Sequence, residues 1–443
     1  MFRIVIICFL ALLIGCRGER TSPQPDLPNG TPDGSDSLVN LVAVPDVIKV
    51  NFYLENSHSM GGYYGHASRF YENVDGLITD LMIDGFDLYT NTIAESVEEY
   101  SSPEDFRTAL NPTNDTQIAI GKSSPLGSIL QQVFEKSNTS ELNILVTDGI
   151  ISGSNEQIED LKRKNKDYNL EYISSLVNDI KLGLSPYIDQ FETKIYAFKS
   201  DFEASRANPY YKLNNSKVTK GVFPNRPYYI LVIGTPEVMD VFEQKYARKI
   251  TAEQVLEFGF IPRKDEVAKL TRFAITNACR VDGERLIFEE GRGSYKFSLL
   301  LDLDDFPSQY QDSEFLSETM ELRDDQDDVL QDVLLETYAL KELPGDLSIF
   351  RKDSRLNKEI KGYTHVVTAS LGDIAPASLT ELKLVFKKDY HNWYQQWSSP
   401  NDLDIDFNDN KTFGFEHFVS GIIQAYGGLD QPIYEKRIKV ETH

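Results

Sequence analysis

The chain has 443 residues, and the roughly 400 that follow a short N-terminal signal and a polar segment predict two domains of ordinary size. Its formal net charge of −24 argues against nucleic acid or an anionic lipid surface as a partner, because the summed field of the protein would repel either. A cation is the better expectation.

The N-terminus has the features of an export signal. Arg3 precedes an apolar run at residues 4–14, which is too short to span a bilayer, and Gly15 and Cys16 follow it. A Cys directly after Gly in this position resembles the lipobox of bacterial lipoproteins. The resemblance implies cleavage before Cys16 and a lipid on the new amino terminus. An ordinary signal peptide with an incidental Cys is the alternative.

The next segment predicts a tether. Residues 17–45 are rich in Ser, Pro, Asp and Gly and carry too little apolar surface to fold. The resemblance to the lipobox in the signal at residues 1–16 implies a lipid-anchored protein of the bacterial cell envelope, in the outer membrane if the cell is Gram-negative. Since Cys8 lies in the signal and Cys16 would carry lipid, Cys279 has no partner for a disulfide in the mature chain.

Residues 46–250 alternate predicted strands and helices. Apolar periodicity predicts strands at 48–54, 86–93, 142–146, 194–198 and 228–233, with helices at 70–82, 126–134, 170–188 and from 235 onward. This order predicts an α/β domain with a doubly wound, mostly parallel sheet. The long connection at 200–227, with its tyrosines, is either a partner-binding surface or a locally packed loop.

Polar residues follow two of these strands. Glu55, Ser57 and Ser59 come after the strand at 48–54, and Asp148 comes after the strand at 142–146. Ser124 is predicted to be the N-cap of the next helix, with Pro125 at its first position. Carboxylate and hydroxyl oxygens suit Mg²⁺, Mn²⁺ or Ca²⁺. The alternative is that Ser124 and Asp148 only cap helices.

These residues, in this order, resemble the von Willebrand factor type A domain. The stretches are Glu55-x-Ser57-x-Ser59, Ser124 before Pro-Leu-Gly, and Thr147-Asp148-Gly149. The resemblance implies a metal-ion-dependent adhesion site with Ser57, Ser59 and Ser124 as hydroxyl ligands and Asp148 as a carboxylate at or near the metal. The chain departs from the family by having Glu55 in place of Asp and Ser124 in place of Thr.

The function expected from this resemblance is adhesion. The metal would bind an acidic residue of a protein partner, and the chain would not be an enzyme. Two alternatives are a metal-assisted envelope hydrolase and a scaffold with a degenerate metal site. The chain has no nucleotide-binding loop, since position 116 is Thr where that motif needs Gly, and no serine-hydrolase or zinc-protease motif. His58 could act as a base only if it faced one of the serines.

Residues 251–443 predict a second, β-rich domain resembling a sandwich. Predicted strands lie at 272–281, 295–303, 363–371 and 379–386. An amphipathic helix at 415–426 is predicted to pack against this sheet or against the first domain. Trp393 and Trp397 either mark a binding face or are buried.

Overall fold

A computed structural model describes residues 48–443 apart from 65–67, 114–117, 119–124, 152–162, 164–169, 213–215, 247–248, 265, 277, 291–293, 345–353, 373–378 and 402–409. The predicted signal, Cys16 and the tether lie outside these residues, and so does Ser124.

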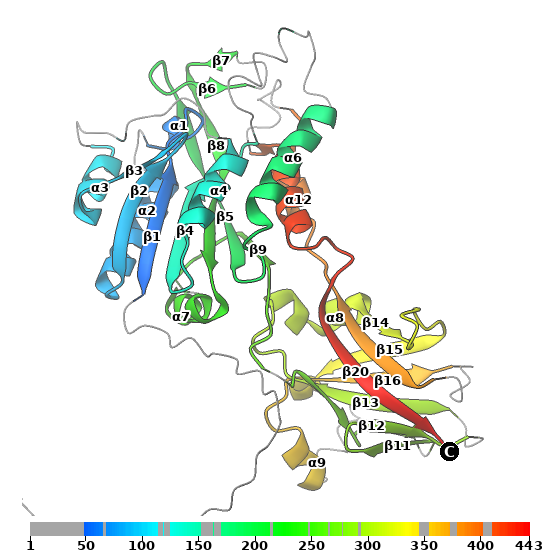
Figure 1. The fold of residues 1–443 in the computed structure, drawn as a ribbon. Helices are drawn as coiled ribbons and strands as arrows, with labels where there is room; N and C mark the ends of the chain where they lie inside the picture. The colour runs from blue at the N-terminus through cyan, green and yellow to red at the C-terminus, as the bar shows by residue number, and fades with distance from the viewer. Residues whose placement is uncertain are drawn as a thin grey trace, which may run out of the picture. The chain divides into compact units, whose positions relative to one another are not determined.

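A seven-stranded sheet forms the centre of the N-terminal part (Figure 1). Alternation places Val50, Phe52 and Leu54 in the core on one face of this sheet and Tyr53 in the core on the other. The strands, in spatial order, are β3 (Val97–Glu99), β2 (Asp87–Ile93), β1 (Lys49–Glu55), β4 (Glu141–Thr147), β8 (Gly221–Gly234), β5 (Glu192–Ala204) and β9 (Gln254–Phe258).

The sheet is mixed, not mostly parallel as predicted. β1 runs parallel to β2 and β4, whereas β8 is antiparallel to β4 and β5, and β9 is antiparallel to β5. The reason is the segment at 200–227, predicted as a connection. It extends both strands and contains β6 (Tyr210–Tyr211) and β7 (Lys217–Val218), so the chain turns back without a crossover helix.

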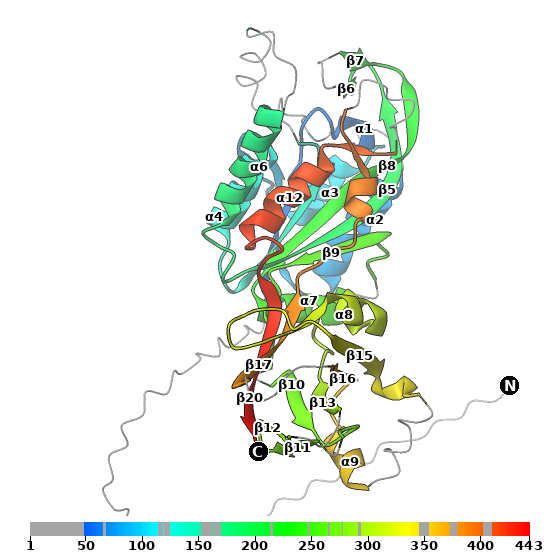
Figure 2. The same cartoon turned by 90° about the vertical axis from the view of Figure 1, so that its right-hand side faces the viewer.

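Helices cover both faces of the sheet (Figure 2). One face packs against α2 (Arg69–Ile83), α3 (Pro103–Leu110) and α7 (Pro236–Tyr246). The other packs against α4 (Leu126–Lys136), α6 (Leu170–Leu184) and α12 (Phe415–Ala425). The α/β class and the presence of helices on both faces of the sheet are therefore confirmed. The short helix α1 (Gly61–Tyr64) was not predicted.

Two further sheets share one core in the β-rich part, as a sandwich requires. The first has the order β10 (Ala268–Thr271), β13 (Tyr295–Leu301), β16 (His365–Leu371) and β15 (Val333–Ala339). The second has the order β11 (Cys279–Asp282), β12 (Arg285–Phe288), β20 (Pro432–Thr442), β17 (Glu381–Lys387) and β14 (Met320–Arg323). The prediction of one strand at 272–281 is wrong, because Phe273 and Ala274 form a turn between β10 and β11.

Short helices complete this part: η1 (Ser308–Gln311), α8 (Ser313–Thr319), η2 (Leu340–Glu342) and α9 (Ser354–Glu359).

A C-terminal segment returns to the first sheet. It contains α10 (Trp393–Gln396), β18 (Ser398–Ser399), β19 (Thr412–Phe413) and α12. Phe415 stacks on Tyr229 of β8 with ring centroids 3.9 Å apart, and Trp393 is buried in the same cluster. Since β9 also belongs to the first sheet, residues 251–443 contribute to both cores.

Candidate metal site

Two neighbouring strands end together at the candidate site. β1 and β4 are parallel and pair Leu54 with Val146, so Glu55 and Thr147 follow at the same edge of the sheet. Carboxyl ends of parallel strands commonly form ligand-binding crevices in α/β folds. The predicted residues Glu55, Ser57 and Asp148 are all buried near this edge.

Glu55 is fixed by hydrogen bonds. Its carboxylate accepts a hydrogen bond from the Thr147 hydroxyl, and its main-chain carbonyl accepts one from the Tyr64 hydroxyl of α1. The Thr147 oxygen in turn accepts from the Gly149 amide at 3.0 Å. Thr147 was not among the predicted site residues, although it stands beside Asp148 in the sequence.

Ser57 and Ser59 form a hydroxyl pair on the turn that leads into α1. Their Oγ atoms are 2.8 Å apart, Ser57 is buried, and Ser59 is partly exposed. The turn is closed by the Met60 amide, which donates to the Ser57 carbonyl at 3.1 Å. The two hydroxyls are thus held next to each other, and Ser59 gives the pair its contact with solvent.

Only one of the two carboxylate oxygens of Asp148 accepts a hydrogen bond from the described residues. Oδ1 accepts a hydrogen bond from the Ile150 amide at 3.0 Å, whereas Oδ2 is buried and accepts none from the described residues. Burial raises the pKa of this carboxyl, while the nearby Ser59 hydroxyl, the Ile150 amide and the Arg226 charge oppose the rise. A buried carboxylate oxygen without a donor is costly unless a cation or proton satisfies it.

A buried arginine lies behind this edge. Arg226 of β8 is 2% exposed, and its guanidinium lies 4.4 Å from the centre of the Tyr210 ring. Burial acts to lower the pKa of Arg226, but Tyr210, Tyr63 and the charge of Asp148 outweigh it and hold this pKa above its usual value. Arg226 could not be recognised from the sequence, because its place beside the site depends on the pairing of β8 with β5, in which Arg226 lies opposite Ser200.

The predicted helix start at Ser124 needs correction. α4 begins at Leu126 with Pro125 at the N-cap position, one residue later than predicted. Because proline lacks a side-chain acceptor, no side-chain hydrogen bond caps this end of α4. The place of Ser124 in the candidate site remains an expectation.

The donor set suits a hard divalent cation. Glu55 and Asp148 supply carboxylates, and Ser57 and Ser59 supply hydroxyls, so all donors are oxygen. Within the part of the chain that the structure describes, His, Cys, Asp and Glu side chains form no group of three or more that could hold a metal. A cation here would depend on the serines as well as on the carboxylates.

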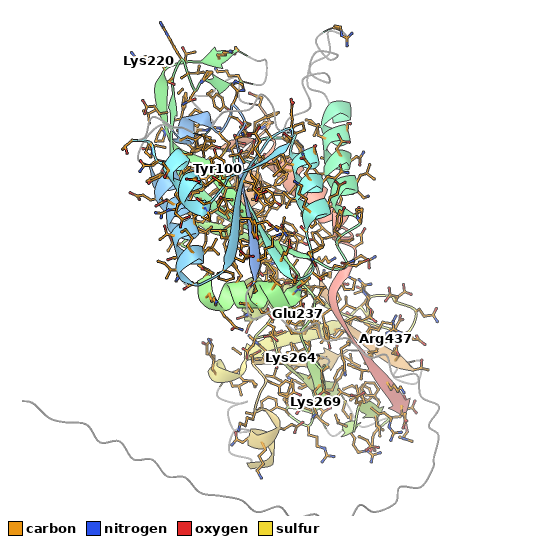
Figure 3. All side chains as sticks on the ribbon, turned by 60° about the vertical axis from the view of Figure 1, so that its left-hand side comes forward. Tyr100, Lys220, Glu237, Lys264, Lys269 and Arg437 are labelled. Atoms are coloured by element: carbon orange, nitrogen blue, oxygen red, sulfur yellow. The ribbon has the colours of Figure 1, made fainter. Side chains whose placement is uncertain are left out.

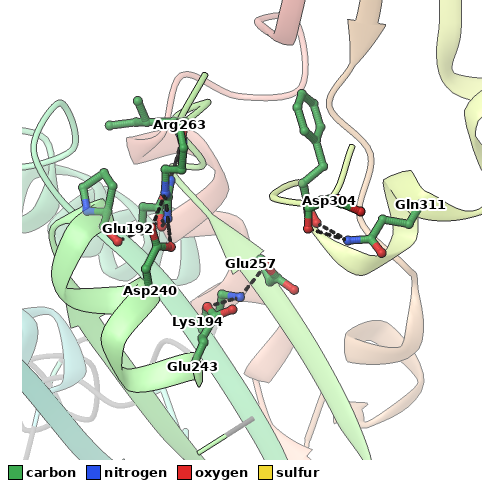
Figure 4. Close-up of polar contacts among 11 residues, drawn as sticks. Glu192, Lys194, Asp240, Glu243, Glu257, Arg263, Asp304 and Gln311 are labelled. Carbon is green, nitrogen blue, oxygen red and sulfur yellow. Dashed lines mark hydrogen bonds and ion pairs between the residues drawn. The ribbon is translucent and has the colours of Figure 1, made fainter. Parts of the chain in front are cut away.

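A second set of charges, most of them partly buried, forms ion pairs within itself (Figure 4). Arg263 binds Glu192 at 2.8 Å and Asp240 at 3.0 Å, and Lys194 binds Glu257 at 2.8 Å and also Glu243. Each cation faces two carboxylates. This pairing indicates a structural role for the cluster.

We found no family model, curated protein or solved structure that matches this chain. None of the helices in the described ranges combines the length and apolar character that crossing a membrane requires.

Proposed function

We propose that the α/β part binds Mg²⁺ or Mn²⁺ at the ends of β1 and β4 and, through this ion, an acidic residue of a protein partner. The observation that carries the proposal is the buried Oδ2 atom of Asp148, which no described residue satisfies. The resemblance to the type A domain supports the same place, whereas the antiparallel β8 departs from the mostly parallel sheet expected for that family.

In this proposal the protein would supply part of the ion's oxygen shell. Asp148 would give a charged oxygen, and Ser57 and Ser59 would give neutral ones. Glu55 accepts a hydrogen bond from Thr147 and so links the ends of β1 and β4. Ser124 would add a further hydroxyl, as the resemblance implies. Ser59 is partly exposed, so a carboxylate of the partner would reach the site from this side and would complete the oxygen shell of a bound ion.

A scaffold without a working metal site is the second candidate. It is favoured by Arg226, whose buried positive charge already acts on Asp148. In that case the arginine would serve in place of a metal, and added ions would not change stability.

Thermal unfolding with and without metal separates the two candidates. A ligand that binds only the folded state stabilises it by about 2.7 kcal/mol at 100 times its dissociation constant. We expect Mg²⁺ or Mn²⁺ to raise the unfolding temperature, a chelator to reverse the rise, and Asp148→Ala to abolish it. Ser59→Ala should reduce the rise less, because it removes a neutral oxygen.

Two further variants sharpen the test. Asp87→Asn removes an exposed carboxylate from the start of β2, at the opposite end of the sheet, and should keep the full metal effect. Glu55→Asp restores the residue of the type A family, so tighter binding would show that the longer side chain weakens the site. A wild type without any chelator-reversible shift would favour the scaffold.

A further inference from the structure

Strands β5 and β8 extend beyond the other strands of the first sheet, at the end that holds the candidate site. The last pair between β4 and β8 joins Thr147 to Tyr229, yet β8 begins at Gly221 and continues to pair with β5 as far as Ala204. At about 3.4 Å per residue, this projection is roughly 25 Å long. We call residues 201–212 and 216–227 the arm; it carries β6 and β7 (Figure 1).

The root of the arm packs against the turn that carries the site serines. Phe202 lies edge-on to Tyr63 of α1, with ring centroids 5.2 Å apart, and the Tyr63 hydroxyl donates to the Pro227 carbonyl at 2.7 Å. A Cβ atom on Gly62 would come within 2.3 Å of the Phe202 ring. Since α1 follows Ser59 almost directly, the arm and the candidate site share this contact.

The interior of the arm is aromatic and fixed. Phe202, Tyr210 and Phe223 form mutual ring contacts with centroids 5.8 to 6.2 Å apart, and Arg226 lies among them. Tyr210, Tyr228 and Tyr229 are at most 1% exposed. For these three tyrosines, the prediction of local packing is therefore confirmed. A partner would therefore meet the outer side chains of the arm and would find the backbone of β5 and β8 already ordered.

The charged side chains on the outside of the arm are mainly basic. Arg206, Lys217 and Lys220 are exposed and Lys212 is partly exposed, against two exposed acids, Asp201 and Glu203. Figure 3 shows Lys220 pointing away from the arm. In a chain of net charge −24, this excess of two positive charges gives the arm a local charge of the opposite sign.

We propose that the arm docks an acidic segment of the protein partner, next to the carboxylate that the metal would hold. This inference rests on the proposed function. Positive side chains on the arm would attract such a segment and increase its association rate, while the rest of the acidic surface repels it. Specificity for acidic sequence then comes from the arm and dependence on the ion comes from the site.

The test uses a fluorescent oligoglutamate peptide as the probe, with oligoglutamine as the neutral control, and measures anisotropy in Mn²⁺ at low salt. Wild-type protein should bind oligoglutamate and not oligoglutamine. Reversal of two arm charges in Arg206→Glu/Lys220→Glu should weaken binding about tenfold or more, with a smaller difference at high salt. The matched control Lys136→Glu/Lys181→Glu makes the same charge change on exposed residues of α4 and α6.

The outcomes separate this inference from the proposed function. Equal affinity of the arm variant and the wild type, or no binding of oligoglutamate by the wild type, overturns the arm as a docking surface. The manganese-induced thermal shift is measured on the same samples. Its presence in the arm variant with lost peptide binding supports the inference, whereas its absence in the wild type contradicts the metal site itself.

Discussion

Asp148 is buried, has one carboxylate oxygen that none of the described residues satisfies, and lies in the field of Arg226. Burial raises its pKa above the value in the unfolded chain, so the metal-free folded protein binds more protons than the unfolded chain between those two pKa values. The free energy of unfolding should therefore fall as pH rises through this window. A metal ion needs the ionised carboxylate, so its affinity should rise over the same window.

Asp148→Asn removes this titration while keeping the shape of the side chain. Without metal, the variant should lose that part of the pH dependence and be more stable than the wild type above the window, because no charge is buried. Urea unfolding across a pH series in chelator measures both effects. Identical pH profiles for variant and wild type would mean that Asp148 does not titrate in this range.

Gly149 should resist substitution for two reasons. Its φ of 69° is left-handed, and an added Cβ would lie 2.7 Å from the Tyr229 ring. Gly85 has a φ of 78° but open space around it, so Gly85→Ala should cost only the backbone term of about 1–2 kcal/mol. Gly149→Ala should cost about 1–3 kcal/mol more from the clash. Denaturant unfolding measures both variants, and equal costs would show that Tyr229 moves freely aside.

The sequence predicts those site residues that lie at the ends of strands recognisable from their apolar periodicity. Glu55, Ser57 and Asp148 follow apolar strands, and the structure brings them to one buried edge. Arg226 could not be found this way, since an arginine in a Tyr- and Asn-rich segment gives no sign of burial. Its place is set by strand pairing between distant parts of the chain.

At the scale of elements, the buried strands and amphipathic helices of the first part were predicted from their period. The arm was not, because Pro224, Asn225 and Pro227 interrupt the alternation that marks a strand. Asn225 has a φ of 57°, beside the shift in register between Ser200 and Phe202. Pairing with β5 thus imposes a strand that the local sequence does not favour.

The helix α12 should contribute strongly to the stability of the first sheet. Phe415 is fully buried and stacks on Tyr229, so Phe415→Ala should lower the free energy of unfolding by about 3–5 kcal/mol. Leu429, just beyond the helix, is 53% exposed, and Leu429→Ala should change it by less than about 0.5 kcal/mol. Chemical denaturation of both variants decides the matter; similar effects would mean that α12 adds little.

At the scale of the whole molecule, the sandwich strands other than β20 lie in the sequence between β9 of the first sheet and the segment from α10 to α12, which packs on that sheet. Thr412 links this segment to the site edge: its hydroxyl donates to the Asp148 carbonyl at 3.3 Å and accepts from the Tyr229 hydroxyl at 3.1 Å. The pattern at 415–426 predicted an amphipathic helix but left open which sheet it covers. Periodicity describes one face of an element and does not identify the surface against which that face packs.

The lipid anchor expected at Cys16 would act at the scale of the whole chain. Exchange of Cys16 for Ser should prevent lipidation and move the protein from the membrane fraction to the soluble fraction, because the apolar run before it is too short to span a bilayer. Fractionation together with incorporation of a labelled fatty acid measures this. A Cys16→Ser variant that stays in the membrane and still carries label would contradict the lipid anchor.

The metal site is tested most directly by a crystal structure of the protein grown with Mn²⁺, with anomalous data collected near the manganese edge. We expect an anomalous peak in contact with Asp148 Oδ2 and within coordination reach of Ser57 and Ser59, and no peak there in Asp148→Asn. A wild-type map without a peak at this edge of the sheet, under conditions in which Mn²⁺ is in large excess, would contradict the proposed function.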